Sequence, residues 1–142
     1  MFAPCRADAA REGARTMDET QTRSDVLTWF EIPAQDFDRA AAFYEAVMGA
    51  PLQREDMMGE RFAVFPYQRP RMSGAVVCRP WQQPAMQGVL IYLNCAGRLD
   101  AAIAAAEAHG GAVLQTMDLP PGLGRIALIR DPEGNRVGLH SV

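Results

Sequence analysis

Arg-Ile-Ala-Leu-Ile-Arg-Asp-Pro-Glu-Gly-Asn-Arg-Val-Gly-Leu-His, from Arg125 to His140, is the most informative stretch of this chain. It reads as a strand, a tight Asp-Pro-x-Gly turn and a second strand. Asp131 opens the turn, Pro132 presets the φ angle of its first corner, and Gly134 supplies the backbone freedom needed at its end. The stretch therefore predicts a β-hairpin near the C-terminus.

The pattern that ends in this hairpin occurs twice. Each copy has an apolar strand, an amphipathic helix and three further strands. The first helix is expected between Asp36, a good N-cap, and the stop at Gly49, and the second between Leu99 and His109. The strands are expected at 26–32, 52–56, 61–65, 72–78, 89–95, 112–117, 124–130 and 136–141. Neither β-α-β-β-β copy could easily bury a core alone, so the two modules must pack together.

Bulk properties indicate one globular domain. The 142 residues are 49% hydrophobic and 22% charged with a net charge of −3, and no basic cluster occurs, so nucleic acid and membrane are not expected partners. No apolar run is long enough to span a bilayer, the three cysteines form no Cys-x-x-Cys pair, and a cytoplasmic location fits best.

Residues 1–24 mix charges without an apolar stripe, which predicts a disordered tail before a domain at 25–142. Met17 is a possible alternative start.

Four motifs together resemble the vicinal oxygen chelate superfamily, which includes glyoxalase I, bleomycin-resistance proteins and extradiol dioxygenases. They are Asp36-x-x-Arg39-Ala40-x-x-Phe43-Tyr44 with Gly49, Met72-Ser73-Gly74-Ala75, Tyr92-Leu93-Asn94, and Asp131-Pro132-Glu133-Gly134-Asn135-Arg136 through Leu139-His140. The resemblance implies an α+β fold in which the two modules form a curled eight-stranded mixed sheet, with helices outside and a cavity inside. A ferredoxin-like α+β sandwich is the alternative, and the duplicated extra strand disfavours it.

Metalloenzymes of that superfamily hold a metal at four positions, and the resemblance places all four on this chain. They fall at Trp29, on the strand 73–77, at Leu90 (Val89 if the register slips by one) and at Gly138. The strand 73–77 contains no carboxylate or imidazole, and the other three side chains offer no metal donor. We therefore expect no metal and no other cofactor.

A ligand cavity is expected instead. Strand alternation points Trp29 and Tyr92 away from the helices and into the hollow. The wall expected for binding a small organic molecule consists of Trp29, Phe65, Tyr67, Met72, Tyr92 and Asn94. The alternative is that Trp29 and Tyr92 only fill the space left by a lost metal site.

Two ionisable residues are candidates for catalysis in the same cavity. Glu31 lies two residues beyond Trp29, and His140 lies two beyond Gly138, so both are predicted to face inward. Together they could form a hydrogen-bonded acid/base pair, or half of a displaced metal site. Alternatively, His140 is structural, and Glu31 lies at the cavity mouth or pairs with an arginine.

The first functional hypothesis is a metal-free binding protein of the glyoxalase/bleomycin-resistance type, which binds a small organic molecule in its curled-sheet cavity. The alternative is a lyase, isomerase or dioxygenase of the same superfamily that acts on a small oxygenated metabolite through Glu31 and His140. A third is a scaffold domain whose role is dimerisation. The resemblance also implies a homodimer, with each cavity formed within one chain.

Overall fold

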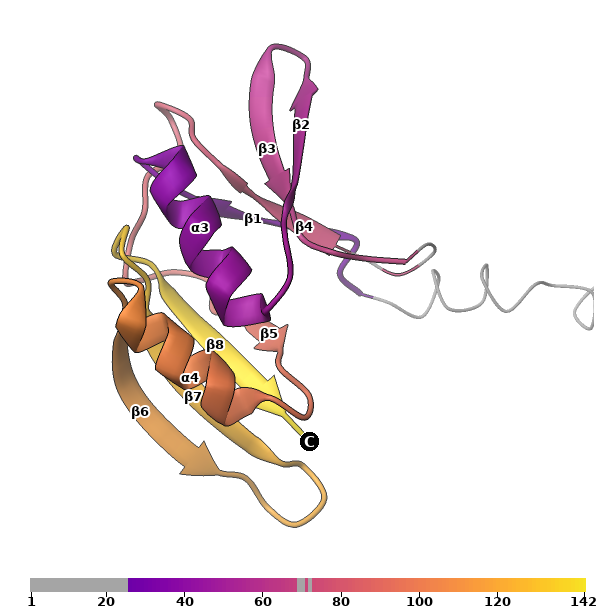
Figure 1. Ribbon diagram of the computed structural model, residues 1–142, viewed down its shortest axis with the longest axis vertical. Coiled ribbons are helices and arrows are strands. Elements are labelled where there is room, and N and C mark those ends of the chain that lie inside the picture. Colours follow the sequence, from indigo (N-terminus) through magenta and orange to yellow (C-terminus); the bar gives the residue numbers. More distant parts are fainter. Residues whose placement is uncertain (1–25, 69–70, 72) are drawn as a thin grey trace, which may run out of the picture.

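The computed structural model of the chain describes residues 26–68, 71 and 73–142 (Figure 1). Its first module contains β1 (Trp29–Pro33), α3 (Phe37–Met48), β2 (Gln53–Met57), β3 (Glu60–Val64) and β4 (Ser73–Val77). Its second contains β5 (Tyr92–Asn94), α4 (Leu99–Ala108), β6 (Ala112–Asp118), β7 (Arg125–Arg130) and β8 (Arg136–Ser141). The predicted tail, residues 1–24, and the predicted site residue Met72 lie outside the described part of the chain.

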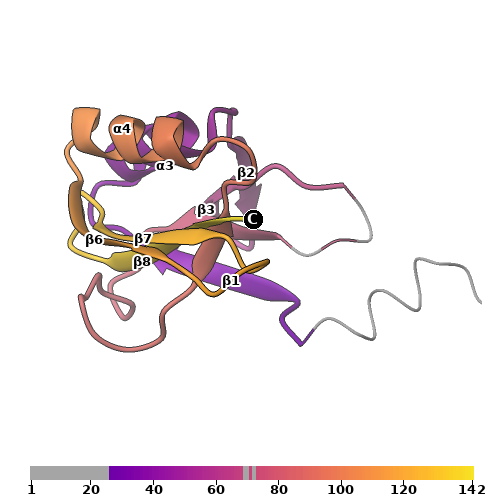
Figure 2. The same cartoon turned by 90° about the horizontal axis from the view of Figure 1, so that it is seen from below.

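The eight strands form two four-stranded sheets with the same internal order. These orders are β1-β4-β3-β2 and β5-β8-β7-β6. β1 pairs in parallel with β4, and β5 pairs in parallel with β8. The other neighbouring strands are antiparallel. Both helices lie side by side on one side of the sheets, and the segment that joins the modules loops on the other (Figure 2). The predicted α+β fold of two β-α-β-β-β modules is confirmed, because a single-sheet ferredoxin-like sandwich would not repeat this order.

Local signals set both ends of α3 as predicted. The Asp36 side chain accepts a hydrogen bond from the backbone amide of Arg39 at 3.0 Å, which is the usual N-cap contact. At the other end Gly49 has a φ of +66°, a left-handed conformation that glycine adopts without steric cost. The helix buries one apolar face between these caps, formed by Phe37, Ala40, Ala41, Phe43, Tyr44 and Val47.

The main core lies between the helices and the sheets and draws on both modules. Its largest fully buried side chains include Tyr44 and Phe43 from α3, and Ile129 and Leu139 from the second sheet. The first sheet also buries a smaller apolar cluster on its opposite face, formed by Phe62, Val64, Ala75 and Val77. Because α3 packs on α4 and the main core is shared, neither module is a separate folding unit.

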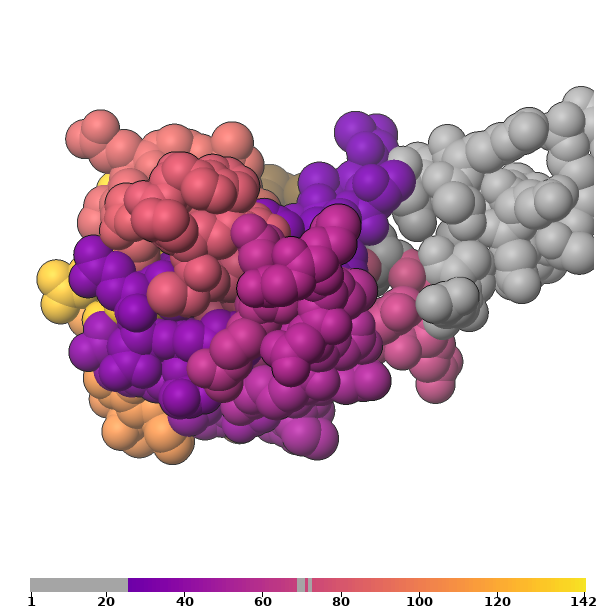
Figure 3. Space-filling model, turned by 90° about the horizontal axis from the view of Figure 1, so that it is seen from above, coloured from indigo at the N-terminus to yellow at the C-terminus, as the bar shows by residue number. Residues whose placement is uncertain are grey.

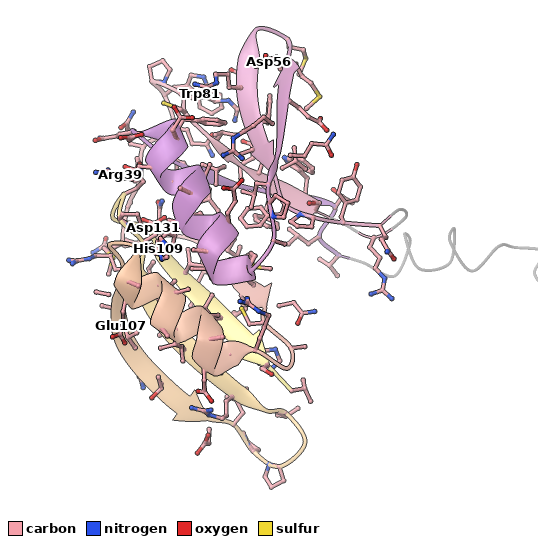
Figure 4. All side chains as sticks on the ribbon, viewed as in Figure 1. Arg39, Asp56, Trp81, Glu107, His109 and Asp131 are labelled. Atoms are coloured by element: carbon pink, nitrogen blue, oxygen red, sulfur yellow. The ribbon has the colours of Figure 1, made fainter. Side chains whose placement is uncertain are left out.

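The Asp-Pro-Glu-Gly turn of the second module docks on the first module. Asp131 is only 1% exposed, and its carboxylate accepts hydrogen bonds from the Tyr44 hydroxyl at 2.6 Å and from Asn135 Nδ2 at 2.8 Å. The backbone amides of Glu133 and Asn135 donate to its other oxygen. Figure 4 shows Asp131 where α3, α4 and the start of β8 come together. A buried carboxylate needs such partners, so this network fixes the turn against α3.

The second module also holds both ends of α3. At the N-terminal end, Glu133 accepts a hydrogen bond from the Asp36 amide at 3.0 Å and forms an ion pair with Arg39 at 2.7 Å. At the C-terminal end, the Arg98 guanidinium donates to the carbonyl oxygen of Val47. A negative group at the start and a positive group at the end both complement the helix dipole. The two modules are therefore joined by polar contacts as well as by the core.

We expect Tyr44→Phe to lower the free energy of unfolding by about 1–3 kcal/mol, because the buried Asp131 carboxylate loses one hydrogen-bond donor. Urea unfolding followed by circular dichroism measures the change. Tyr67→Phe is the matched control, since Tyr67 is exposed and its change should stay within about 0.5 kcal/mol. Equal stability of the two variants would contradict this role of the Tyr44 hydroxyl.

Alkaline pH should weaken the fold through the same residue. Burial, and then the Asp131 carboxylate, raise the pKa of Tyr44 well above its usual value. Above about pH 10, the Tyr44 hydroxyl keeps its proton in the folded state and loses it in the unfolded state. The contribution of this hydroxyl to the free energy of unfolding is therefore complete below about pH 10 and is lost as the pH rises further. The sequence contains no lysine to titrate in this range. We expect the urea midpoint to fall as the pH rises above about 10, and to fall less in Tyr44→Phe.

Candidate ligand-binding site

A cavity of about 360 Å³ lies between β1 and residues 83–91, which belong to the segment that joins the two modules. Figure 3 shows this segment, in coral, packed beside indigo residues of the first module. Apolar side chains from both sides and a few polar groups line the cavity: Leu27, Trp29, Phe30, Glu31, Ile32, Pro33, Gln83, Ala85, Gln87, Val89, Ile91, Asn135, Arg136 and Val137. A size of a few hundred cubic ångströms with few polar groups is typical of small-molecule sites.

Strand alternation explains which β1 side chains face away from the helices. Ile32 is buried in the main core, and Phe30 packs against that core. Trp29 and Glu31 therefore point to the opposite face, as predicted. The indole of Trp29 remains 38% exposed, so it can contact a bound molecule.

Asn135 holds the cavity walls together. Its side-chain amide donates to the carbonyl oxygen of Pro33 at 2.7 Å, at the end of β1. Its side-chain oxygen accepts a hydrogen bond from the Ala85 amide at 3.1 Å, on the joining segment. Because Asn135 is buried and also bonded to Asp131, the cavity wall is attached to the contact between the modules.

Arg79 holds the Glu31 carboxylate in an ion pair. Its guanidinium forms ion pairs with Glu31 and, at 2.7 Å, with Glu60, and it lies over the rings of Phe62 and Trp81 at 5.4 and 4.9 Å. The Arg79 side chain is only 9% exposed, and the hydrogen bonds to Glu60 and Glu31 raise its pKa further. These contacts therefore agree with the alternative in which Glu31 pairs with an arginine.

His140 lies on β8 beside Asn94 of β5, and its Nε2 is 2.7 Å from the carbonyl oxygen of Leu123. It is not among the residues that line the cavity. Glu31 is in the cavity wall and has an arginine partner, whereas His140 has a backbone partner in another loop. The structure does not bring these two side chains together in one cavity.

The expected aromatic wall is divided among several places. Trp29 lines the cavity, whereas Tyr92 and Asn94 are exposed on β5, outside its lining. Phe65 is buried in the main core, 5.6 Å from the ring of Tyr44, because alternation along β3 turns Phe62 and Val64 to the opposite face. Tyr67 is exposed beside a separate depression at residues 51–53 and 64–67.

The residues at the four metal positions do not fit a metal. A Cβ atom built on Gly138 would lie 2.2 Å from Cδ1 of Tyr92, so the Tyr92 ring occupies the space that a ligand side chain at Gly138 would need. Across residues 26–68, 71 and 73–142, no group of three His, Cys, Asp or Glu side chains could hold an ion. Indole and aliphatic groups at Trp29 and Leu90 supply no donor.

Sequence reasoning missed several residues of the site. Arg136 could have been found, because alternation along β8 places it on the same face as Gly138 and His140. The contacts of Arg79 with Glu31 and Glu60, and of Asn135 with Pro33, gave no local signal, since these partners lie 19 to 102 positions away in the sequence. Residues 83–88 were assigned no role in the cavity, and residues 89–91 were predicted as part of a strand.

Comparisons with known proteins agree with this architecture. The model of the "Glyoxalase-like domain" family matches residues 29–140. The Mycobacterium bovis protein named "Putative glyoxylase CFP32" is 32% identical over 126 residues, which cover 86% of this chain and 44% of that protein. The chain thus spans less than half the length of the curated relatives it matches. No helix in the described part of the chain has the length and apolarity needed to cross a bilayer.

Two solved structures show the same fold. A glyoxalase/bleomycin resistance protein from Albidiferax ferrireducens has a TM-score of 0.64 and 20% identity, and the match covers 83% of this chain and all of that one. A glyoxalase/bleomycin resistance protein from Streptomyces sp. CB03234 has a TM-score of 0.59 and 25% identity, with 80% and 97% of the two chains covered. Since the family model spans nearly all of both modules, the chain belongs to the glyoxalase-like domain family of the vicinal oxygen chelate superfamily.

Proposed function

We propose that this protein binds a small organic molecule, without a metal, in the cavity between β1 and segment 83–91. The observation that carries the proposal is the partly exposed indole of Trp29 in the wall of a cavity of about 360 Å³. An exposed aromatic side chain offers a large contact area to a ligand. The neighbouring side chains, Leu27, Val89 and Ile91, extend this apolar surface.

Binding is better supported than catalysis through Glu31 and His140. A general base must reach the proton that it removes, but the Glu31 carboxylate is held by Arg79 and the His140 imidazole by Leu123. A ligand would have to displace both contacts to use the two residues together. Binding beside Trp29 requires no such change.

Elemental analysis should find far less than one divalent metal ion per chain in protein purified without a histidine tag and dialysed. The reason is the donor chemistry at Trp29, Leu90 and Gly138, together with the position of the Tyr92 ring. About one zinc, nickel, manganese or iron per chain, retained after dialysis, would contradict a metal-free cavity.

Trp29→Ala should weaken binding about tenfold, or ~1.4 kcal/mol, for aromatic compounds found in a thermal-shift screen. The chain has two tryptophans, so Trp81→Phe leaves Trp29 as the sole indole, and its fluorescence should be quenched by the same compounds. Calorimetry on Tyr67→Ala is the control, because Tyr67 lies outside the cavity. Compounds that bind with unchanged affinity to Trp29→Ala would place the ligand elsewhere.

A further inference from the structure

Two arginines face each other across neighbouring strands beside the cavity. In the antiparallel register Arg130 of β7 pairs directly with Arg136 of β8. Their strand neighbours Ile129 and Val137 are buried in the main core, so both arginines point to the face opposite the helices. Both residues are exposed. Like charges directly opposite on one face of a sheet repel each other.

Neither arginine has a carboxylate partner among the described residues. Five other arginines of this part of the chain form ion pairs: Arg39, Arg54, Arg61, Arg79 and Arg125. The acids of the nearby turn are already engaged, Asp131 by Tyr44 and Glu133 by Arg39. The positive charges of Arg130 and Arg136 are therefore not balanced by any described side chain.

Arg136 places this charge in the cavity. It lines the cavity beside Trp29 and also an adjoining depression of about 220 Å³ formed mostly by residues 85–90. The other charged lining residue is Glu31, whose carboxylate is held in an ion pair by Arg79, which also pairs with Glu60. The end of the cavity at Arg136 therefore presents a positive charge without an ion-pair partner among the described residues, although the chain as a whole has a net charge of −3.

We propose that the ligand is a small, elongated organic anion, with its carboxylate on Arg136 and its apolar body against Trp29. The inference rests on the proposed function and specifies the ligand class of the same cavity. Arg136 follows Asn135, which bonds to Pro33, so it lies near the Pro33 end of β1. Trp29 is four residues away at the other end, about 13 Å along a strand. An elongated anion reaches between the two groups.

Cinnamate and its uncharged analogue cinnamamide provide a matched pair of probes for calorimetry on the full chain. The two have almost the same shape and differ in charge. Cinnamate should bind at least tenfold more tightly than cinnamamide, because hydrogen bonds between charged groups are the stronger kind. Acetate, which lacks the apolar body, should bind much more weakly than cinnamate.

Arg136→Gln should weaken cinnamate binding about tenfold to a hundredfold and leave cinnamamide binding nearly unchanged. Arg136→Lys should retain part of the preference for the acid, since it keeps the charge but loses the planar fork. Arg125→Gln is the control, because Arg125 lies at the far end of the same strand pair and is held by Asp100 and Asp118. The affinity of the Arg125→Gln variant for cinnamate should equal that of the parent protein.

Folding of the variant is checked separately. Removing one of two opposed like charges should leave the melting temperature of Arg136→Gln unchanged or slightly raised, so weaker binding would not reflect unfolding.

Equal binding of acid and amide, both sensitive to Trp29→Ala, would leave the proposed function standing and overturn the anion inference. Unchanged cinnamate affinity in Arg136→Gln, or acetate binding as tight as that of cinnamate, would also overturn it. If only uncharged or cationic compounds from the screen quench Trp29, the cavity binds ligands but not anions. If no compound responds to Trp29→Ala, the proposed function itself fails.

Discussion

A carboxylate lies at the junction of the two modules, where Asp131 accepts hydrogen bonds from Tyr44, from Asn135 and from two backbone amides of its own turn. A buried charge is tolerated only when such donors replace water. Since Tyr44 belongs to α3 and the turn to the second module, the carboxylate has its full set of donors only when the modules are together. Their relative position is therefore fixed by hydrogen-bond geometry, whereas an apolar interface could slide more easily.

The same turn connects the fold to the cavity. Asn135 binds Asp131 on one side, and on the other it holds Pro33 of β1 and Ala85 of the joining segment. Arg136 comes next in the chain, so its guanidinium extends from a strand position beside a residue fixed by three side-chain contacts. A binding group on such a rigid element keeps its position better than one on a loop. On the same strand Gly138 leaves room for the Tyr92 ring, in the space where metalloenzymes of the superfamily carry a ligand.

The sequence predicted the elements well because their signals are local. The cap at Asp36, the stop at Gly49 and the Asp-Pro-Glu-Gly turn depend on residues within four positions of each other, and all three appear in the structure. The strand predicted at 89–95 was too long, since β5 spans only Tyr92–Asn94 and Val89 is exposed. The side-chain contacts around the cavity could not be predicted in this way. Arg79 finds Glu31 only after the chain has folded across 48 positions, and no local pattern encodes that contact.

The contacts at α3 also have a consequence for the order of folding during synthesis. The helix emerges from the ribosome before the groups that hold its two ends, Glu133 and Arg98, have been translated. Until residues 131–135 are available, the Tyr44 hydroxyl lacks its acceptor and the first sheet lacks the other half of the shared core. Domains usually fold as units during translation. The nascent first module should therefore remain incompletely folded, and open to chaperones, until the final hairpin has left the exit tunnel.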